Sequence, residues 1–399
     1  MTMKQSVRAV LRIALALMIV PGCTVSEGTK KSSNSSPLIT ASPDDRSETG
    51  LGRWQQLPKS PLRARAGAAA VWTGTELVVW GGTDHKRFFS DGAAYDPDTS
   101  RWRTLAKSPL GARTVPSAVW TGRVVLVWGG AKSGHEVFGD GAAYNPRTDS
   151  WRLLPPGPDA RYSHTATWTG DRMIVWGGTP DKLTAPLSDG ASYDPAGDAW
   201  TTVAESPLTA RLGHSAVWNG ARMIVFGGAD YSKRSPHDRF RDGALYDPRS
   251  DAWSDLPPAE TRRAWHSALW ADGALWVVGG LGGMSDVRTT MATWSRNGWT
   301  SAPSPDGLGA NSSSVTPIGT KRFLVWGGSR DSAARDVTAE GAVYDLRSDE
   351  WQEVGASPLS ARQGHVAVWT GAEIIIWGGH GRCCGSRHFV SDGASFVID

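Results

Sequence analysis

The feature that most constrains the fold of this chain is a Gly-Gly doublet that follows an apolar run and recurs seven times. The runs are LVVWGG (77–82), VLVWGG (125–130), MIVWGG (173–178), MIVFGG (223–228), LWVVGG (275–280), FLVWGG (323–328) and IIIWGG (374–379). Tryptophans between the doublets set a unit length of 46 to 53 residues. A period of this length indicates a repeat architecture, in which each unit buries its apolar faces against its neighbours.

Each unit contains four short segments rich in Val, Ile, Trp and Tyr, separated by turn residues, which predicts a four-stranded antiparallel sheet. The last unit ends at DGASFVID without a Trp strand, whereas residues 53–58 supply an extra one at Trp54. Sheets of this kind pack by radial repetition. We therefore predict an all-β, seven-bladed propeller over residues 53–399, closed into a circle by its N-terminal strand.

The doublet, the spaced aromatic and the recurring Trp resemble the kelch motif over about residues 53–399. The resemblance implies a kelch-type β-propeller. Known kelch propellers include protein-binding modules, copper radical oxidases similar to galactose oxidase, and sugar isomerases, so the fold does not select a function. The tyrosines needed for copper radical chemistry fall in a repeated strand position here, and we expect no cofactor.

The first 52 residues differ in composition from the repeats. Residues 1–22 contain a basic start and a short apolar run, Ile13–Val20, which predicts a signal peptide. The run ends in Val-Pro-Gly-Cys, which resembles a bacterial lipobox and implies that Cys23 is lipidated and palmitoylated; an ordinary secretory signal is the alternative. Residues 23–52 are polar and predict a flexible tether. We expect a lipid-anchored protein of the cell membrane that faces the extracytoplasmic side.

The charge of the chain does not suggest a nucleic-acid partner. The 42 Lys and Arg exceed the 39 Asp and Glu only through Lys4, Arg8 and Arg12 of the signal. Without them the charges balance, so we expect no nucleic-acid partner. The expected partners are the membrane, through Cys23, and an unidentified protein or glycan. We expect a monomer.

The loops that follow the Gly-Gly doublets vary in sequence, whereas the other hairpin turns are short and uniform. Variable loops on a rigid scaffold usually carry function, and topology places these loops together on one face. We predict a binding or interaction propeller whose ligand lies on this variable-loop face; a carbohydrate-acting enzyme is the alternative. No motif fixes a catalytic pair, so we name no catalytic residue and favour binding. His380, Arg382 and His388 in the last such loop are candidate ligand contacts.

Cys383 and Cys384 are adjacent in that loop, and Cys23 is the one other cysteine. In an oxidising compartment we predict a disulfide between the two neighbours. It requires a distorted turn, because adjacent Cα atoms lie closer than in most disulfides. A metal site formed with His380 and His388, or free thiols, are the alternatives, and we predict no metal.

Six of seven inner strands begin with an arginine and six of seven third strands begin with an acid; the exceptions are Gly309 and Thr290. The exceptions coincide if each arginine pairs with the acid of the preceding blade. A buried charge needs a partner, so we predict a structural ring of ion pairs between blades rather than a ligand site. The predicted pairs are Arg113 with Asp91, Arg161 with Asp140, Arg211 with Asp189, Arg263 with Asp242, Arg362 with Glu340, and Arg65 with Asp392.

The ring is interrupted between the fifth and sixth blades, where the inner strand is GLGANSSSVTPIG (307–319). Asn311, Ser312 and Ser313 are small and polar there, and we consider them the lining of a candidate pocket. A degenerate repeat is the alternative.

Four histidines share one position of the inner strand, three residues after the arginine: His164, His214, His266 and His365. A metal site is conceivable, since His is a common ligand. We predict that they pack between blades, because Ala68, Pro116 and Ser312 fill the same position in other units.

Overall fold

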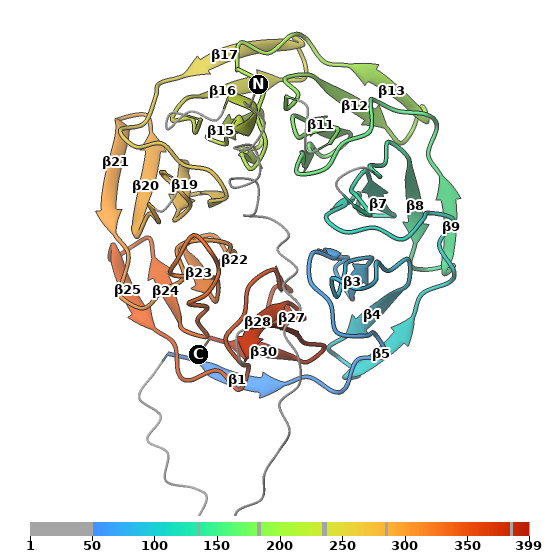
Figure 1. The fold of residues 1–399 in the computed structure, drawn as a ribbon, viewed down its shortest axis with the longest axis vertical. Coiled ribbons are helices and arrows are strands. Elements are labelled where there is room, and N and C mark those ends of the chain that lie inside the picture. The colour runs from blue at the N-terminus through green and yellow to red at the C-terminus, as the bar shows by residue number, and fades with distance from the viewer. Residues whose placement is uncertain are drawn as a thin grey trace, which may run out of the picture. The chain divides into compact units, whose positions relative to one another are not determined.

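In the computed structural model, described residues are 51–133, 136–181, 185–233, 238–283, 286–383 and 386–398, without the side chains of Lys233 and Cys383. They form seven four-stranded antiparallel sheets arranged as blades around an axis (Figure 1). The prediction of a seven-bladed propeller is confirmed.

Blades 1 to 7 follow the chain. Their first, innermost strands are β2 (Ala69–Trp72), β6 (Ser117–Trp120), β10 (Thr165–Trp168), β14 (Ser215–Trp218), β18 (Ser267–Ala271), β22 (Ser314–Ile318) and β26 (Val366–Trp369). The second strands are β3 (Leu77–Trp80), β7 (Val125–Trp128), β11 (Met173–Trp176), β15 (Met223–Phe226), β19 (Ala274–Val278), β23 (Arg322–Trp326) and β27 (Glu373–Trp377). The third strands are β4 (Gly92–Asp96), β8 (Gly141–Asn145), β12 (Gly190–Asp194), β16 (Gly243–Asp247), β20 (Thr290–Ser295), β24 (Gly341–Asp345) and β30 (Gly393–Val397). The fourth strands are β5 (Arg101–Thr104), β9 (Ser150–Leu153), β13 (Ala199–Thr202), β17 (Ala252–Leu256), β21 (Gly298–Pro303), β25 (Glu350–Glu353) and β1 (Arg53–Gln56).

The circle closes as predicted, because β1 is the fourth strand of blade 7. It pairs antiparallel with β30, with Trp54 opposite Phe396 (Figure 1). The Trp54 indole donates its N–H to the Gly355 carbonyl of blade 6, 2.8 Å away. The first described strand therefore joins the last sheet of the chain by hydrogen bonds and by aromatic packing.

The core lies between adjacent sheets. The second strand of blades 1 to 4 is buried at every position, so it reads as a continuous apolar run. Tryptophans of the fourth strands pack against the neighbouring blade and bond to it, as when Trp151 donates to the Ala106 carbonyl at 3.0 Å. The recurring tryptophans are thus largely inter-blade core, as predicted.

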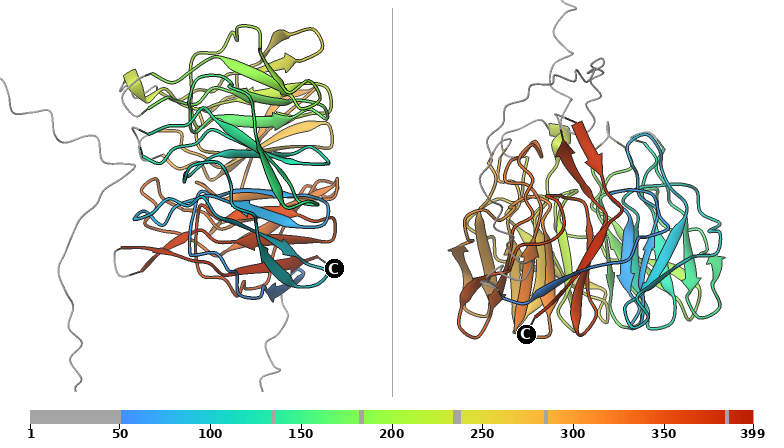
Figure 2. Two further views of the ribbon diagram at one scale, coloured as in Figure 1. Left: turned by 90° about the vertical axis from the view of Figure 1, so that its right-hand side faces the viewer. Right: turned by 90° about the horizontal axis from the view of Figure 1, so that it is seen from below.

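The two faces differ as the topology requires. Loops between second and third strands lie on one face, and two additional elements occur there: the short 3-10 turn η1 (Tyr231–Lys233) and the hairpin formed by β28 (His380–Cys383) and β29 (Ser386–Phe389). Figure 2 shows the red hairpin and the yellow-green turn at this face, while the C-terminus lies at the other. We call these the variable-loop face and the short-turn face.

Among the described residues, no helix is long and apolar enough to cross a membrane. Residues 1–50, with the predicted signal peptide and most of the predicted tether, lie outside the described ranges.

Candidate functional site

The repeated arginines form ion pairs, but the predicted partners are wrong. Five of the six pair with the acid of their own blade. The observed pairs are Arg65–Asp91, Arg113–Asp140, Arg161–Asp189, Arg211–Asp242 and Arg362–Asp392, with Nη1–Oδ1 distances of 2.7 to 3.0 Å. The arginine side chains are fully buried, whereas the carboxylates remain 39 to 58% exposed.

The geometry of the inner strand explains the error. The backbone of Arg113 contacts the preceding blade, because its N–H donates to the Phe89 carbonyl and its carbonyl accepts from the N–H of Gly82. Its side chain turns the other way, over the Gly129 carbonyl, and reaches Asp140 of its own sheet. The repeated arginine therefore bonds to the preceding blade through its backbone. Its ion pair lies within its own blade.

Blades 5 and 6 depart from this pattern. Arg263 donates to the carbonyl and the hydroxyl of Thr290, both at 2.7 Å, and no carboxylate takes that place. Glu340 of blade 6 is exposed, and the repeated inner-strand position of its blade holds no arginine. The predicted pairing rested on Gly309 and Thr290 being exceptions in adjacent blades. The structure shows no contact behind that coincidence, because each arginine bonds within its own blade.

The sequence comparison of blade 6 was also wrong by one residue. Asn311 forms a bridge with Ser329, as Ala66 does with Thr83, so Ala310 rather than Gly309 occupies the arginine position. Ser313 and not Ser312 is therefore equivalent to the repeated histidines. Asn311 and Ser313 are buried, and Ser312 is exposed, so the three do not line one pocket.

A small cavity of about 10 Å³ does lie between blades 5 and 6. Its lining includes Gly279, Arg288, Ser304, Gly309 and Ala310. The interruption of the repeat thus leaves a space, but its lining includes none of Asn311, Ser312 and Ser313.

The four repeated histidines bond across blade interfaces. Each Nε2 lies 2.8 to 3.0 Å from a hydroxyl of the preceding blade. The pairs are His164–Ser117, His214–Thr165, His266–Ser215 and His365–Ser314. Burial lowers the pKa of His164, His266 and His365 to about 3, and the pKa of His214 well below its usual value. The neutral rings serve packing, as predicted.

Two residues beyond each repeated arginine, one residue per blade enters the left-handed region of backbone conformation. These seven residues, which we call the axial ring, are Gly67, Val115, Ser163, Gly213, Trp265, Ser312 and Gly364, with φ from 47° to 64°. They come just before the innermost strands, at the end toward the variable-loop face. Backbone bonds join neighbours in the ring, as when Trp265 donates its N–H to the Gly213 carbonyl at 2.8 Å.

Trp265 is the outlier of the axial ring. A bulky side chain at positive φ is strained by about 1–3 kcal/mol, whereas glycine is not. Its indole is 36% exposed, and among the described residues it is one of three large apolar side chains with that much exposure. Such strain is often retained where a side chain serves a ligand.

A buried network holds Trp265 in place. The indole lies over Gly213, whose position would leave a Cβ only 2.8 Å from Cε2 of the ring. Its Nε1 donates to the hydroxyl of Tyr231 at 2.9 Å. Arg239 stacks on Tyr231 and forms a nearly buried ion pair with Asp238, with Nη1 2.7 Å from Oδ1. The exposed ring is therefore a rigid platform.

The β28–β29 hairpin carries a second cluster, formed by His85, His380, Arg382, Arg387 and Phe389, which we call the hairpin cluster. The Phe389 ring lies 5.0 Å from His85 and 5.3 Å from His380. Arg382 and Arg387 are directly opposite each other in the hairpin. Arg387 also donates from Nη1 to Nε2 of His85.

The charges of this cluster are carried by its arginines. Burial, followed by Arg387 and His85, lowers the pKa of His380 to about 4. Burial and Arg387 also lower the pKa of His85. Both rings are neutral near pH 7, so the positive charges of the cluster lie on Arg382 and Arg387. The hairpin therefore presents a cationic edge beside an aromatic patch.

His388 lies apart from His380. It pairs with Gly381, whereas His380 pairs with Phe389, and successive residues of a strand face opposite sides. His388 is exposed and His380 is 9% exposed. Cys384 and the side chain of Cys383 lie outside the described residues, so the disulfide stays a prediction. Within the described ranges no three His, Cys, Asp or Glu side chains gather as for a metal ion.

A wider hollow of about 410 Å³ lies between blades 7 and 1 toward the short-turn face. Its lining includes Gln55, Tyr95, Ser100 and Glu373. Glu373 is the one carboxylate in this lining, so the hollow does not supply a pair of acids for general acid–base chemistry.

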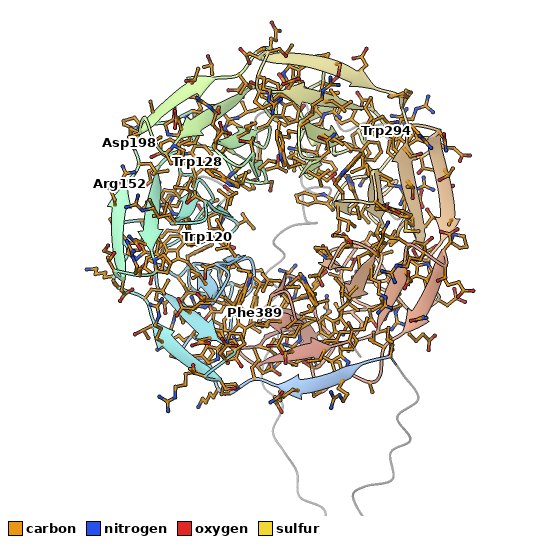
Figure 3. The ribbon with its side chains drawn as sticks, turned by 180° about the vertical axis from the view of Figure 1, so that it is seen from behind. Trp120, Trp128, Arg152, Asp198, Trp294 and Phe389 are labelled. Atoms are coloured by element: carbon orange, nitrogen blue, oxygen red, sulfur yellow. The ribbon has the colours of Figure 1, made fainter. Side chains whose placement is uncertain are left out.

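The sequence analysis named His380, Arg382 and the variable-loop face as candidates, and these remain predictions; it did not name Trp265, Tyr231, Arg239 or Arg387, which the structure places on the same face. A signal for Trp265 was present, because it is the single aromatic residue at a position filled elsewhere by Gly, Ser or Val. At the outer rim, Arg152 and Asp198 form a half-exposed ion pair, and Trp120 lies further in (Figure 3).

Comparison with known proteins agrees with the geometry. Residues 67–280, more than half of the chain, match the model of the KLHDC2/KLHL20/DRC7 Kelch-repeats domain. The F-box/kelch-repeat protein SKIP25 of Arabidopsis thaliana is 24% identical over 135 residues, which are 31% of this chain and 33% of that protein. The aligned part therefore spans about a third of the length of that curated relative.

Among solved structures, that entitled "Structure of YjhT" has the same fold, with a TM-score of 0.57 and 17% identity. The match covers 74% of this chain and 99% of that one. A kelch propeller is a scaffold for binding or interaction. The chain belongs to the KLHDC2/KLHL20/DRC7 Kelch-repeats domain family.

Proposed function

We propose that this propeller binds a protein segment or a glycan on its variable-loop face, with Trp265 and the hairpin cluster as the main contacts. The observation that carries the proposal is Trp265 itself: an exposed indole at positive φ, fixed by Tyr231. Exposed aromatic residues on a rigid support recur as binding anchors because they bury much area at little entropic cost.

The hairpin cluster supplies charge to the same face. Arg382 and Arg387 are the cationic groups of the β28–β29 hairpin, which projects from the propeller (Figure 2). A carboxylate or phosphate on the ligand would accept charge-assisted hydrogen bonds from these arginines. The proposed ligand therefore carries an apolar or ring surface for Trp265 and an anionic group for the hairpin.

The test is binding of the purified protein to a glycan array and to a peptide array. We expect signals that weaken at least tenfold in Arg387→Gln, because the glutamine keeps a polar side chain that can donate hydrogen bonds but removes the charge. Arg152→Gln on the outer rim is the matched control and should bind as the wild type does. Equal loss in both variants, or no binding on either array, would contradict the proposal.

We also propose that the protein is lipid-anchored through Cys23 and faces the extracytoplasmic side. The basic start, the apolar run Ile13–Val20 and the Val-Pro-Gly-Cys sequence support this. Labelling of cells with a palmitate analogue should mark the wild type and not Cys23→Ser. A Cys23→Ser protein that retains the label would sink the proposal.

The vicinal disulfide is proposed for the same oxidising compartment. Protein purified without reductant should have a mass two hydrogens lower than after reduction. Bound zinc or copper in stoichiometric amount would instead support a metal site at the hairpin tip.

A further inference from the structure

A tyrosine of the third strand makes a repeated contact near the short-turn face, and blade 1 departs from it. In blades 2, 3, 4 and 6 its hydroxyl donates to an aspartate five residues later: Tyr144–Asp149, Tyr193–Asp198, Tyr246–Asp251 and Tyr344–Asp349. In blade 1 the tyrosine is Tyr95 and the fifth residue is Ser100, which has the same left-handed backbone conformation as Asp149, with φ of 53° and 46°. Tyr95 therefore lacks the carboxylate of its counterparts.

At the interface between blades 1 and 2, a guanidinium bonds to this tyrosine. Arg103 of the blade 1 fourth strand donates from Nε and Nη2 to the two carboxylate oxygens of Glu76, at 2.8 and 2.6 Å. Its Nη1 donates to the hydroxyl of Tyr144 in blade 2, at 2.9 Å. One guanidinium thus joins a carboxylate of one blade to a tyrosine of the next.

The interface between blades 7 and 1 has the carboxylate and the tyrosine but not the arginine. Glu373 takes the place of Glu76, since the backbone N–H of each donates to the threonine hydroxyl three residues earlier. Gln55 takes the place of Arg103, since each follows the tryptophan of its fourth strand. Among the described residues, Glu373 forms no ion pair. The carboxylate of Glu373 and the hydroxyl of Tyr95 are therefore left without the cation that joins their counterparts.

The hollow of about 410 Å³ between blades 7 and 1 lies at this place. All four counterparts of the blade 1–2 contact line it: Gln55, Tyr95, Ser100 and Glu373. Its volume is in the range of roughly 300–1,000 Å³ that small-molecule sites have. Burial raises the pKa of Tyr95, hydrogen bonding with Ser100 lowers it, and the negative charge of Glu373 raises it. The three groups therefore share one environment.

We propose that this hollow binds the guanidinium group of a ligand, with Glu373 and Tyr95 in the roles that Glu76 and Tyr144 have toward Arg103. The carboxylate accepts two hydrogen bonds from one edge of the guanidinium, and the Tyr95 hydroxyl accepts another. Glu373 is the one carboxylate in the lining, so its charge matches that of a single guanidinium. The group belongs to a free guanidino compound or to an arginine side chain of another protein.

The test compares N-acetyl-arginine amide with N-acetyl-citrulline amide, in which a neutral urea replaces the guanidinium. Saturation-transfer NMR with the purified protein measures the affinity for each probe. We expect the arginine probe to bind at least tenfold more tightly, and Glu373→Gln to remove the difference. Gln55→Arg places a guanidinium of the chain itself in the hollow, as Arg103 does between blades 1 and 2, and should abolish binding.

A control variant and a peptide complete the design. Glu350→Gln changes an exposed acid at the start of the blade 6 fourth strand and should bind the arginine probe as the wild type does. Equally tight binding of the peptide Gly-Gly-Arg-Gly-Gly would support a protein ligand, whereas binding of the amide alone would support a free guanidino compound. Equal binding of the arginine and citrulline probes, or unchanged binding in Gln55→Arg, would overturn the proposal.

Discussion

Blades 3 and 5 have the same four strands and a histidine at the same position. They differ in the residue that each places in the axial ring and in the partner of the repeated arginine. Blade 3 places Ser163 in the axial ring and pairs Arg161 with Asp189. Blade 5 places Trp265 in the ring and leaves Arg263 with Thr290. Residues that follow the repeat thus form the scaffold. Residues that depart from it leave an exposed side chain, as at Trp265, or a cation without a carboxylate, as at Arg263. We expect ligands to bind at such departures.

The largest predicted effect concerns what the two blades share, the buried neutral histidines. Between pH 6.5 and about 3 the unfolded chain binds protons on His164, His266 and His365 that the folded chain excludes. His214, whose pKa also lies well below its usual value, acts in the same direction. Stability is therefore full above pH 6.5 and falls as the pH falls, by at most about 1.4 kcal/mol per pH unit for each histidine. Urea unfolding at a series of pH values measures this slope.

A histidine variant provides the control. His164→Gln retains a group that can bond to Ser117 but cannot take up the proton, so it should remove about a quarter of the slope that these four histidines contribute. Imidazole NMR signals of these four residues that titrate near pH 6.5 in the folded protein would contradict their burial as neutral rings.

The second prediction separates the two blades directly. Asp189→Ala leaves the buried Arg161 without its carboxylate and should destabilise the protein by about 3 kcal/mol, at the low end for a broken buried pair because Asp189 is half-exposed. Thr290→Ala removes one hydroxyl acceptor from Arg263 and should cost about 1 kcal/mol. Equal losses in chemical denaturation would remove the distinction between the blades.

The third prediction addresses the strained platform. Trp265→Gly relieves positive φ but loses the packing over Gly213, so the free energy of unfolding should change by less than about 1 kcal/mol. Gly213→Ala should instead cost about 1–2 kcal/mol, because a Cβ at positive φ meets the indole of Trp265 at 2.8 Å. Thermal melts compare the two, and a large loss in Trp265→Gly would make that residue structural.

The smallest effect is expected at the outer rim. Arg152 and Asp198 are about half-exposed and bond at 2.8 Å (Figure 3). Exposed pairs contribute little, so Arg152→Ala should change stability by about 0–1 kcal/mol, and salt should reduce the difference further. A larger loss would show that the rim, as well as the interior, fixes the blades.

The sequence predicted the architecture well because the architecture is periodic. Seven doublets determine the number of blades, the surplus strand at Trp54 determines the closure, and loop variability separates the faces. The shared position of the histidines also indicated packing, and their Nε2 bonds to hydroxyls of the preceding blade agree with it.

The partners of the ion pairs were harder to predict from the sequence, because a position in the repeat does not show into which of two adjacent sheets a side chain turns. Arg113 lies between blades 1 and 2, and its backbone contacts one while its guanidinium enters the other. In blade 6 the irregular spacing moved the alignment by one residue, so Ala310 was overlooked. The support of Trp265 by Tyr231 and Arg239 joins an inner strand to a distant loop, and no local pattern encodes that contact.

The most direct test of the account is ligand binding by a matched pair from the axial ring. Trp265→Gly and Val115→Gly each replace an exposed apolar side chain at positive φ with the residue found at Gly67, Gly213 and Gly364. Calorimetric titration with the strongest array ligand should show binding lost at least tenfold in Trp265→Gly and unchanged in Val115→Gly. Unchanged affinity in Trp265→Gly would contradict the claim that departures from the repeat form the binding site.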